Sequence, residues 1–134
     1  MNPARTVVDG SALFAILLNE PEADRCRAAL QDGGQLLMSA GSLAELLIVA
    51  NAKKNLSEME TMLALIQPEI IPLTAARARA AAEAYRRWGK GFDPAALNIC
   101  DTFAYALAKE HNCPLLFVGQ DFAKTDVVGG LGGW

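Results

Sequence analysis

The chain has few of the residues on which many zinc, redox and nucleophilic sites depend, with three cysteines and one histidine among 134 residues. The number of cysteines is odd, and they are widely spaced, at Cys26, Cys100 and Cys113. This pattern argues against a zinc motif, a redox pair or a disulfide framework. His111 follows a helical pattern and is expected at a helix C-terminus. The sequence therefore argues against a Ser–His or Cys–His hydrolase.

Long apolar runs are also missing, although 52% of the residues are hydrophobic. The richest run, residues 43–50, is far too short to span a bilayer. The N-terminus leads directly into a strand pattern and lacks the organisation of a signal peptide. We therefore expect a cytoplasmic protein with no membrane contact, folded as one domain over residues 1–134. The glycine-rich residues 129–134 are expected to form a flexible tail.

Short apolar runs alternate with segments of helical periodicity along the chain. Strands are predicted at residues 6–8, 35–39, 69–72, 114–118 and 125–128. Helices are predicted from residue 11 and over residues 22–30, 42–51, 57–66, 74–88 and 98–110. This alternation predicts an α/β fold, a three-layer α/β/α sandwich in which helices cover both faces of a mostly parallel sheet.

Four acidic residues lie at the breaks between these strand and helix patterns. They are Asp9, Glu45, Asp101 and Asp121. In an open parallel sheet the ends of strands and the starts of the following helices share one edge, so these carboxylates should converge. A cluster of oxygen ligands is what Mg²⁺ or Mn²⁺ prefers. The sequence thus predicts a metal-dependent enzyme.

Each acid also has a purely structural interpretation. Asp9 fits an Asx turn or a helix N-cap, and Ser42 with Glu45 fits a capping box. Asn98 with Asp101 has the same spacing, and Asp121 fits a simple acid in a turn. Glu45 and Asp101 are nevertheless surrounded by apolar residues, where a carboxylate is costly unless it is paired or bound to metal. A position at a helix N-terminus does not exclude a role as a metal ligand.

Four segments and two further residues carry a resemblance that covers nearly the whole chain. They are residues 8–13, 42–46, 97–108 and 114–122, followed by Thr125 and Asp126. In this order and spacing they resemble the PIN-domain ribonucleases, and within them the VapC-type toxins of bacterial toxin–antitoxin pairs. The resemblance implies an α/β/α sandwich, an acidic site that binds Mg²⁺ or Mn²⁺, and endonucleolytic hydrolysis of RNA.

The resemblance matches Asp9, Glu45, Asp101 and Asp121 to the acidic catalytic quartet of that family. Asp9, Asp101 and Asp121 are expected to hold the metal ion, whereas Glu45 would bind it directly or through water. Asp126 matches a further acid that is common in this branch, and we place it among the residues that could support the site.

Other residues are candidates for supporting roles. Ser11 and Thr102 could orient the metal ligands through their hydroxyl groups, or could simply begin helices. Arg86, Arg87 and Lys90 could bind the RNA backbone, although a solvated helix face is the alternative for such a basic run. Lys53 and Lys54 are weaker candidates for the same contact.

The resemblance also implies partners, because relatives dimerise and are silenced by an antitoxin protein. We therefore expect an RNA substrate, a cognate antitoxin and a homodimer. Two rival classes stay open. A phosphoacceptor domain would also gather acids around Mg²⁺, but it would need a lysine in a context that Lys124 lacks. A catalytically silent module that binds RNA or protein would keep the fold and lose cleavage.

Overall fold

The computed structural model describes residues 4–131, which contain six helices and four strands. The strands are β1 (Arg5–Val8), β2 (Gln35–Ser39), β3 (Glu69–Ile71) and β4 (Leu115–Leu116). The helices are α1 (Gly10–Leu17), α2 (Ala23–Asp32), α3 (Ala40–Ala52), α4 (Leu56–Ile66), α5 (Ala75–Trp88) and α6 (Ile99–His111). The strands are parallel and lie in the order β3-β2-β1-β4. The predicted α/β fold with a parallel sheet is confirmed.

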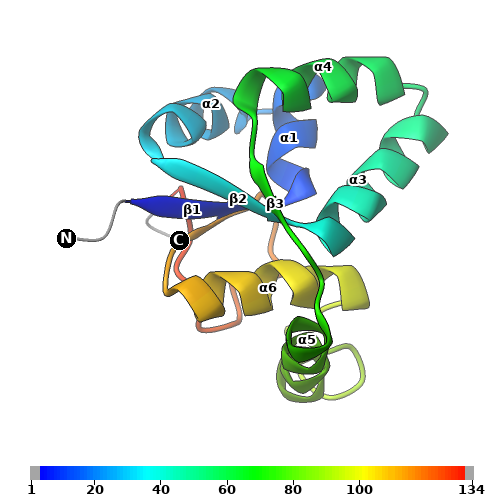
Figure 1. Cartoon of the computed structure of the whole chain (residues 1–134), viewed down its shortest axis with the longest axis vertical. Helices are drawn as coiled ribbons and strands as arrows, with labels where there is room; N and C mark the ends of the chain where they lie inside the picture. The colour runs from blue at the N-terminus through cyan, green and yellow to red at the C-terminus, as the bar shows by residue number, and fades with distance from the viewer. Residues whose placement is uncertain (1–3, 132–134) are drawn as a thin grey trace.

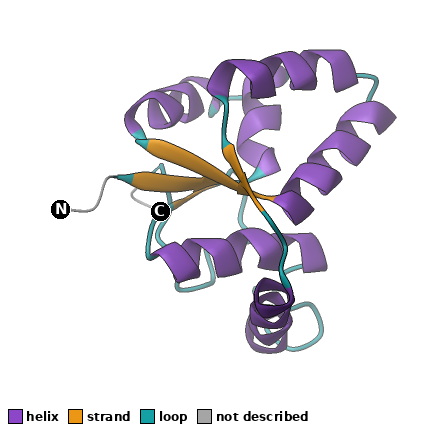
Figure 2. Ribbon diagram, viewed as in Figure 1, coloured by secondary structure: helices purple, strands orange, loops and turns teal. Residues whose placement is uncertain are grey.

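Helices cover both faces of the sheet (Figures 1 and 2). Successive residues of a strand point to opposite faces, so the central strands supply two separate cores. Val7 and Leu37 pack in the core on the side of α6. Val8 and Met38 pack in the core formed with α1, α3 and α4. Helix α5 packs against α6 on the outside of its layer, as Figure 1 shows.

Two strands pass into helices with almost no intervening loop. β1 ends at Val8, and Asp9 caps α1 by accepting a hydrogen bond from the backbone N–H of Ser11. β2 ends at Ser39, whose side chain caps α3 by accepting a hydrogen bond from the N–H of Gly41. The starts of α1 and α3 therefore lie at the C-terminal edge of the sheet, where the start of α6 also lies (Figure 1).

The predicted capping box of Ser42 and Glu45 is wrong. Helix α3 begins earlier, because β2 runs straight into it and Ser39 is its N-cap. Ser42 therefore lies inside the helix, where its hydroxyl is buried and has no hydrogen-bond partner among the described residues. Glu45 lies a full turn into the helix, so its carboxylate is not needed at the helix start.

The predicted final strand over residues 125–128 is also wrong. Residues 120–126 form consecutive turns, and an isolated parallel bridge joins Gly129 to Leu115. The N–H groups of Leu115 and Gly130 bond to the carbonyls of Val128 and Leu115, so the chain returns to β4 after the turns. Residues 132–134 of the expected tail lie outside the described residues. Within residues 4–131, every helix is too short or too polar to cross a membrane.

The two serines at the start of α3 should differ in their effect on stability. Ser39→Ala removes the cap and should lower the free energy of unfolding by about 0.5–2 kcal/mol. Ser42→Ala removes a buried hydroxyl without a partner, so it should be neutral or stabilising. Urea denaturation of both variants would measure this difference. A larger loss in Ser42→Ala than in Ser39→Ala would contradict this start of the helix.

Candidate active site

The structure brings the four predicted acids to one edge of the sheet. Asp9 follows β1, Asp101 lies in the first turn of α6, Glu45 lies in α3 and Asp121 lies in the turns after β4. The charges of Asp9, Glu45 and Asp121 all act on Asp101, and that of Asp121 also acts on Asp9. This edge is also where the order of strands reverses, since the chain moves outward from β1 to β3 and then returns to β4 on the other side of β1. Such a switch point is the usual ligand site of an open parallel sheet.

Asp9 is held in place by Ser11. The hydroxyl of Ser11 donates to Oδ2 of Asp9 at 2.6 Å, and the backbone N–H of Ser11 donates to the same oxygen at 3.0 Å. The Ser11 hydroxyl also accepts a hydrogen bond from the N–H of Val118, just beyond β4, at 3.0 Å. Ser11 thus orients Asp9 and ties the ends of two neighbouring strands together.

Asp101 acts as a capping residue and still has an oxygen to spare. Its Oδ2 accepts a hydrogen bond from the N–H of Asn98 at 3.0 Å, and Asn98 caps the N–H of Asp101 in return at 2.8 Å. Oδ1 of Asp101 has no hydrogen-bond donor among the described residues. The capping interpretation and the ligand interpretation of Asp101 are therefore compatible.

Cys100 is a site residue that the sequence patterns did not single out. Its thiol makes a hydrogen bond with the Glu45 carboxylate. Burial and the negative charge of Glu45 raise the pKa of the Cys100 thiol to about 11, so the thiol stays protonated and donates. Its contact joins α6 to α3, which are far apart in sequence, so local periodicity gave no signal for it.

The acids share an electrostatic problem that the protein alone does not solve. Asp9 and Asp101 are each only 8% exposed. Burial raises the pKa of Asp9, Glu45 and Asp101, and repulsion from the neighbouring acids raises each pKa further. For Asp101 the pKa rises to about 7. The causes of these shifts include no cationic side chain.

The donor set suits a hard divalent cation, because its donors are carboxylate oxygens with uncompensated charge. The geometry is open, since residues 4–131 contain no group of three His, Cys, Asp or Glu side chains arranged closely enough to enclose an ion. Asp9 and Asp101 are fixed by hydrogen bonds. Asp121 is exposed and has no hydrogen-bond or ion-pair partner in the described part of the chain, so its side chain is free to turn toward a cation.

The remaining residues expected to support the site lie in other environments. Thr102 is fully buried and donates its hydroxyl to the carbonyl of Ile99, as a residue at a helix start does. The partners of the Asp126 carboxylate are Tyr105, Lys109 and Arg87, none of which belongs to the acidic cluster. The side-chain hydrogen bonds of Thr102 and Asp126 therefore go to groups other than the four acids.

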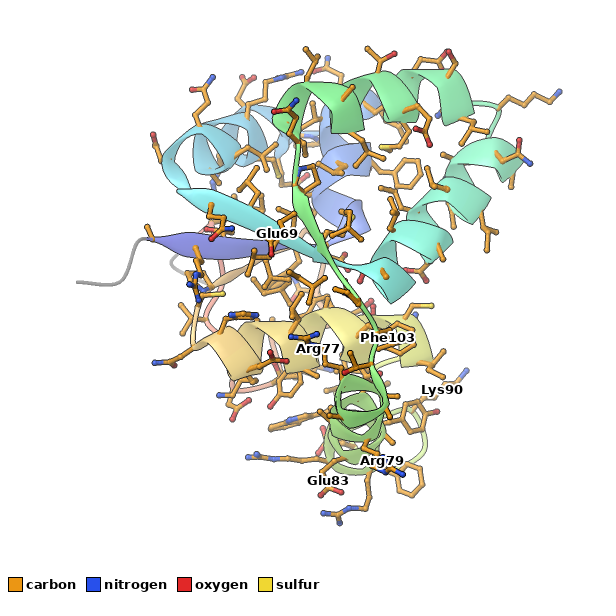
Figure 3. The ribbon with its side chains drawn as sticks, viewed as in Figure 1. Glu69, Arg77, Arg79, Glu83, Lys90 and Phe103 are labelled. Carbon is orange, nitrogen blue, oxygen red and sulfur yellow. The ribbon has the colours of Figure 1, made fainter. Side chains whose placement is uncertain are left out.

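The candidate RNA-binding residues also lie in different environments. Arg86 pairs with Glu83 on the exposed face of α5. Arg87 lies 3.7 Å from Asp126 and stacks on the ring of Trp88. Lys90 lies near the start of α6. Figure 3 shows Lys90 at the same end of that helix as Phe103. Lys90 is thus the basic candidate that follows α5 toward the acidic edge.

The two weaker basic candidates lie on the other side of the sheet. Lys53 is the C-cap of α3, and its ammonium group lies 5.8 Å from the centre of the Phe14 ring. Lys54 follows in a left-handed conformation with a φ of 62°. Both lysines therefore lie at the C-terminal end of α3.

Comparison with known proteins identifies relatives over most of the chain. A family model described as "PIN domain" matches residues 6–128. The chain is 40% identical over 124 residues to "VapC ribonuclease Mb0640" of Mycobacterium bovis. This match covers 90% of this chain and 95% of the relative. It is 41% identical over 124 residues to "Ribonuclease VapC" of Mycolicibacterium smegmatis, covering 90% and 96% of the two chains.

Solved structures share the fold at lower identity. VapC20 of Mycobacterium tuberculosis, described as a sarcin–ricin loop cleaving toxin, matches with a TM-score of 0.73 at 14% identity, over 92% of this chain and 96% of that chain. A chain of a toxin–antitoxin complex from Klebsiella pneumoniae matches with a TM-score of 0.68 at 19% identity, over 92% and 94%. These similarities show a common fold.

The raised pKa of Asp101 predicts how stability depends on pH in the metal-free protein. The folded state holds this proton more tightly than the unfolded chain, whose pKa is near 3.8. The free energy of unfolding should therefore fall as the pH rises from about 4 to about 7. Asp101→Asn cannot ionise, so it should flatten this slope and be more stable than wild type above pH 7 by about 1–4 kcal/mol.

Urea denaturation in EDTA at a series of pH values would measure both slopes. Asp9 and Glu45 should leave a residual slope in the variant, because burial raises the pKa of both carboxyls as well. If the free energy of unfolding changed equally with pH in wild type and Asp101→Asn, this result would contradict the raised pKa of Asp101.

Proposed function

The chain belongs to the PIN-domain family, among relatives of the VapC ribonuclease type, and from this premise we propose that it is a metal-dependent endoribonuclease that acts as the toxin of a toxin–antitoxin pair. The observation that carries this proposal is the group of mutually repelling carboxylates at the C-terminal edge of the sheet, of which Asp9 and Asp101 are buried. Such a group is costly to the apo fold, and a divalent cation offsets the cost.

The proposed metal is Mg²⁺, with Mn²⁺ as an alternative. Asp9, Asp101 and Asp121 would hold it, and Glu45 would bind it directly or through water. When bound, the cation would supply a Lewis acid that stabilises negative charge on the scissile phosphate. The hydrogen bonds that Asp9 and Asp101 receive from Ser11 and the Asn98 backbone keep two of the ligands oriented.

Glu45 is the proposed proton acceptor for the attacking water. Burial raises the pKa of its carboxyl, which brings it closer to the neutral range in which a general base works best. The thiol of Cys100 interacts with this carboxylate. Attack of the water on phosphorus would break the bond to the 3′ oxygen, which leaves with a proton, giving 5′-phosphate and 3′-hydroxyl ends.

The proposal includes an antitoxin and a homodimer as partners, in the cytoplasm. This chain shares its fold with a chain of a toxin–antitoxin complex, which supports an antitoxin as the proposed partner. Helices α3 and α4 also expose large apolar side chains, since Ile48 is 70% and Leu65 is 80% exposed. Met59, in contrast, is fully buried in the core and is not available to a partner.

Cleavage of a pool of small RNAs would test the activity. Wild type should give discrete products with Mg²⁺ and none with EDTA. Asp101→Asn should lose more than about 100-fold in rate, because even the loss of a residue that only orients a ligand costs about 10–100-fold. Glu60→Gln, which removes an exposed acid from α4, should cleave at the wild-type rate.

The same assay distinguishes the rival classes. RNA binding by a folded wild-type protein without Mg²⁺-dependent cleavage would contradict the nuclease and favour a silent binding module. Equal rates for Asp101→Asn and wild type would show that the cleavage comes from a contaminant or from a different site.

A further inference from the structure

The carboxylate of Asp121 depends on the rest of its loop for its position. It is exposed, and within residues 4–131 it has no hydrogen-bond or ion-pair partner. Its charge nevertheless reaches Asp9 and Asp101. What brings Asp121 to the site must therefore be found in the contacts of the loop formed by residues 119–127.

Apolar contacts seat this loop on the sheet. Phe122 is buried, and the centre of its ring lies 5.0 Å from that of Phe117. Val127 is buried in the same core. Between them, the hydroxyl of Thr125 donates to the carbonyl of Phe122 at 2.7 Å and accepts from the N–H of Val127 at 3.3 Å. These contacts close the turn and pack its apolar side chains into the core that α5 and α6 also line.

Asp126 supplies the polar link to both helices of the adjacent layer. Tyr105 of α6 donates its hydroxyl to Oδ1 of Asp126. The Nζ of Lys109 and the guanidinium of Arg87 lie 3.3 Å and 3.7 Å from Oδ2. The Tyr105 hydroxyl also accepts a hydrogen bond from Nε1 of Trp88, the last residue of α5, at 2.9 Å. One carboxylate thus joins the loop to α5 and α6.

This network leaves Asp126 with little capacity to bind a further cation. Both of its oxygens have protein donors, and two cationic side chains already compensate its charge. Tyr105 is buried, and its hydroxyl uses its proton on Asp126. The contrast with Asp9 and Asp101 is sharp, because the charges acting on those acids come from other acids.

We propose that Asp126 is a positioning residue, which together with Tyr105 locks the loop against α5 and α6 and so sets where Asp121 meets Asp9 and Asp101. This inference rests on the proposed function of the acidic site. Asp126 is therefore distinct from the metal ligands, because it affects metal binding through the position of Asp121 and not by coordination.

Two measurements on the whole protein test this role. Isothermal titration calorimetry with Mn²⁺ reports metal affinity, and amide hydrogen exchange of the metal-free protein reports the order of residues 119–125. Tyr105→Phe removes the donor and keeps the Asp126 carboxylate, whereas Asp126→Asn removes the charge. Each should weaken Mn²⁺ binding by roughly 10-fold and speed exchange in the loop. Asp126→Asn added to Asp121→Asn should cause no further loss of affinity.

Glu110→Gln is the matched control. It removes the pair between Arg77 and Glu110, which also joins α5 to α6 but does not touch the loop. This variant should keep both the wild-type affinity and the wild-type exchange, which separates the lock from a general loosening of the two helices.

Each contrary outcome has a distinct meaning. Wild-type affinity and exchange in both Tyr105→Phe and Asp126→Asn would overturn the proposal. An affinity loss in Asp126→Asn that multiplies with that of Asp121→Asn would also overturn it, because Asp126 would then act independently of Asp121. A wild-type protein that binds no Mn²⁺ would instead overturn the proposed function, and unchanged loop exchange in the variants would separately refute the lock.

Discussion

The gathering of negative charge at one edge of a parallel sheet is the physical constraint that links the fold of this protein to its site. The fold produces this arrangement, because strand ends and helix starts meet at this edge. Asp9 follows β1 and Asp101 lies in the first turn of α6, while Glu45 lies one turn into α3 and Asp121 lies in the turns after β4. Asp9 and Asp101 are nearly buried, so neither water nor salt screens their repulsion well. A protein selected for stability alone would avoid such a cluster. Its presence is best understood as a functional site whose cost is offset when a cation binds.

The local chemistry of helix capping gives these acids their precise positions. A helix N-terminus presents unpaired N–H groups, which bind carboxylates and orient them. Asp9 and Asp101 both receive such hydrogen bonds through one oxygen. The same feature that starts each helix therefore holds a ligand in a fixed rotamer. Ser11 extends this principle across the sheet, since its hydroxyl joins Asp9 to the N–H of Val118.

Local patterns predicted the sheet, its helices and the convergence of the acids, because each of these follows from periodicity and from the ends of strands. They failed where two local solutions compete. Ser39 and Ser42 both precede an apolar helix, and only the direct passage of β2 into α3 selects Ser39. They also failed where contacts join distant segments, as with the thiol of Cys100 on Glu45 and the lock on the final loop. Such contacts depend on tertiary packing, which a single sequence does not display.

Diffraction from crystals grown with Mn²⁺ would test the central claim most directly, because anomalous scattering locates the ion without reference to activity. The account predicts a peak at the C-terminal edge of the sheet, within coordination distance of Asp9 and Asp101, with the Asp121 side chain turned toward it. Full occupancy elsewhere, or no peak at this edge in protein that remains folded and saturated with Mn²⁺, would contradict the account. The acids would then need another explanation for their proximity.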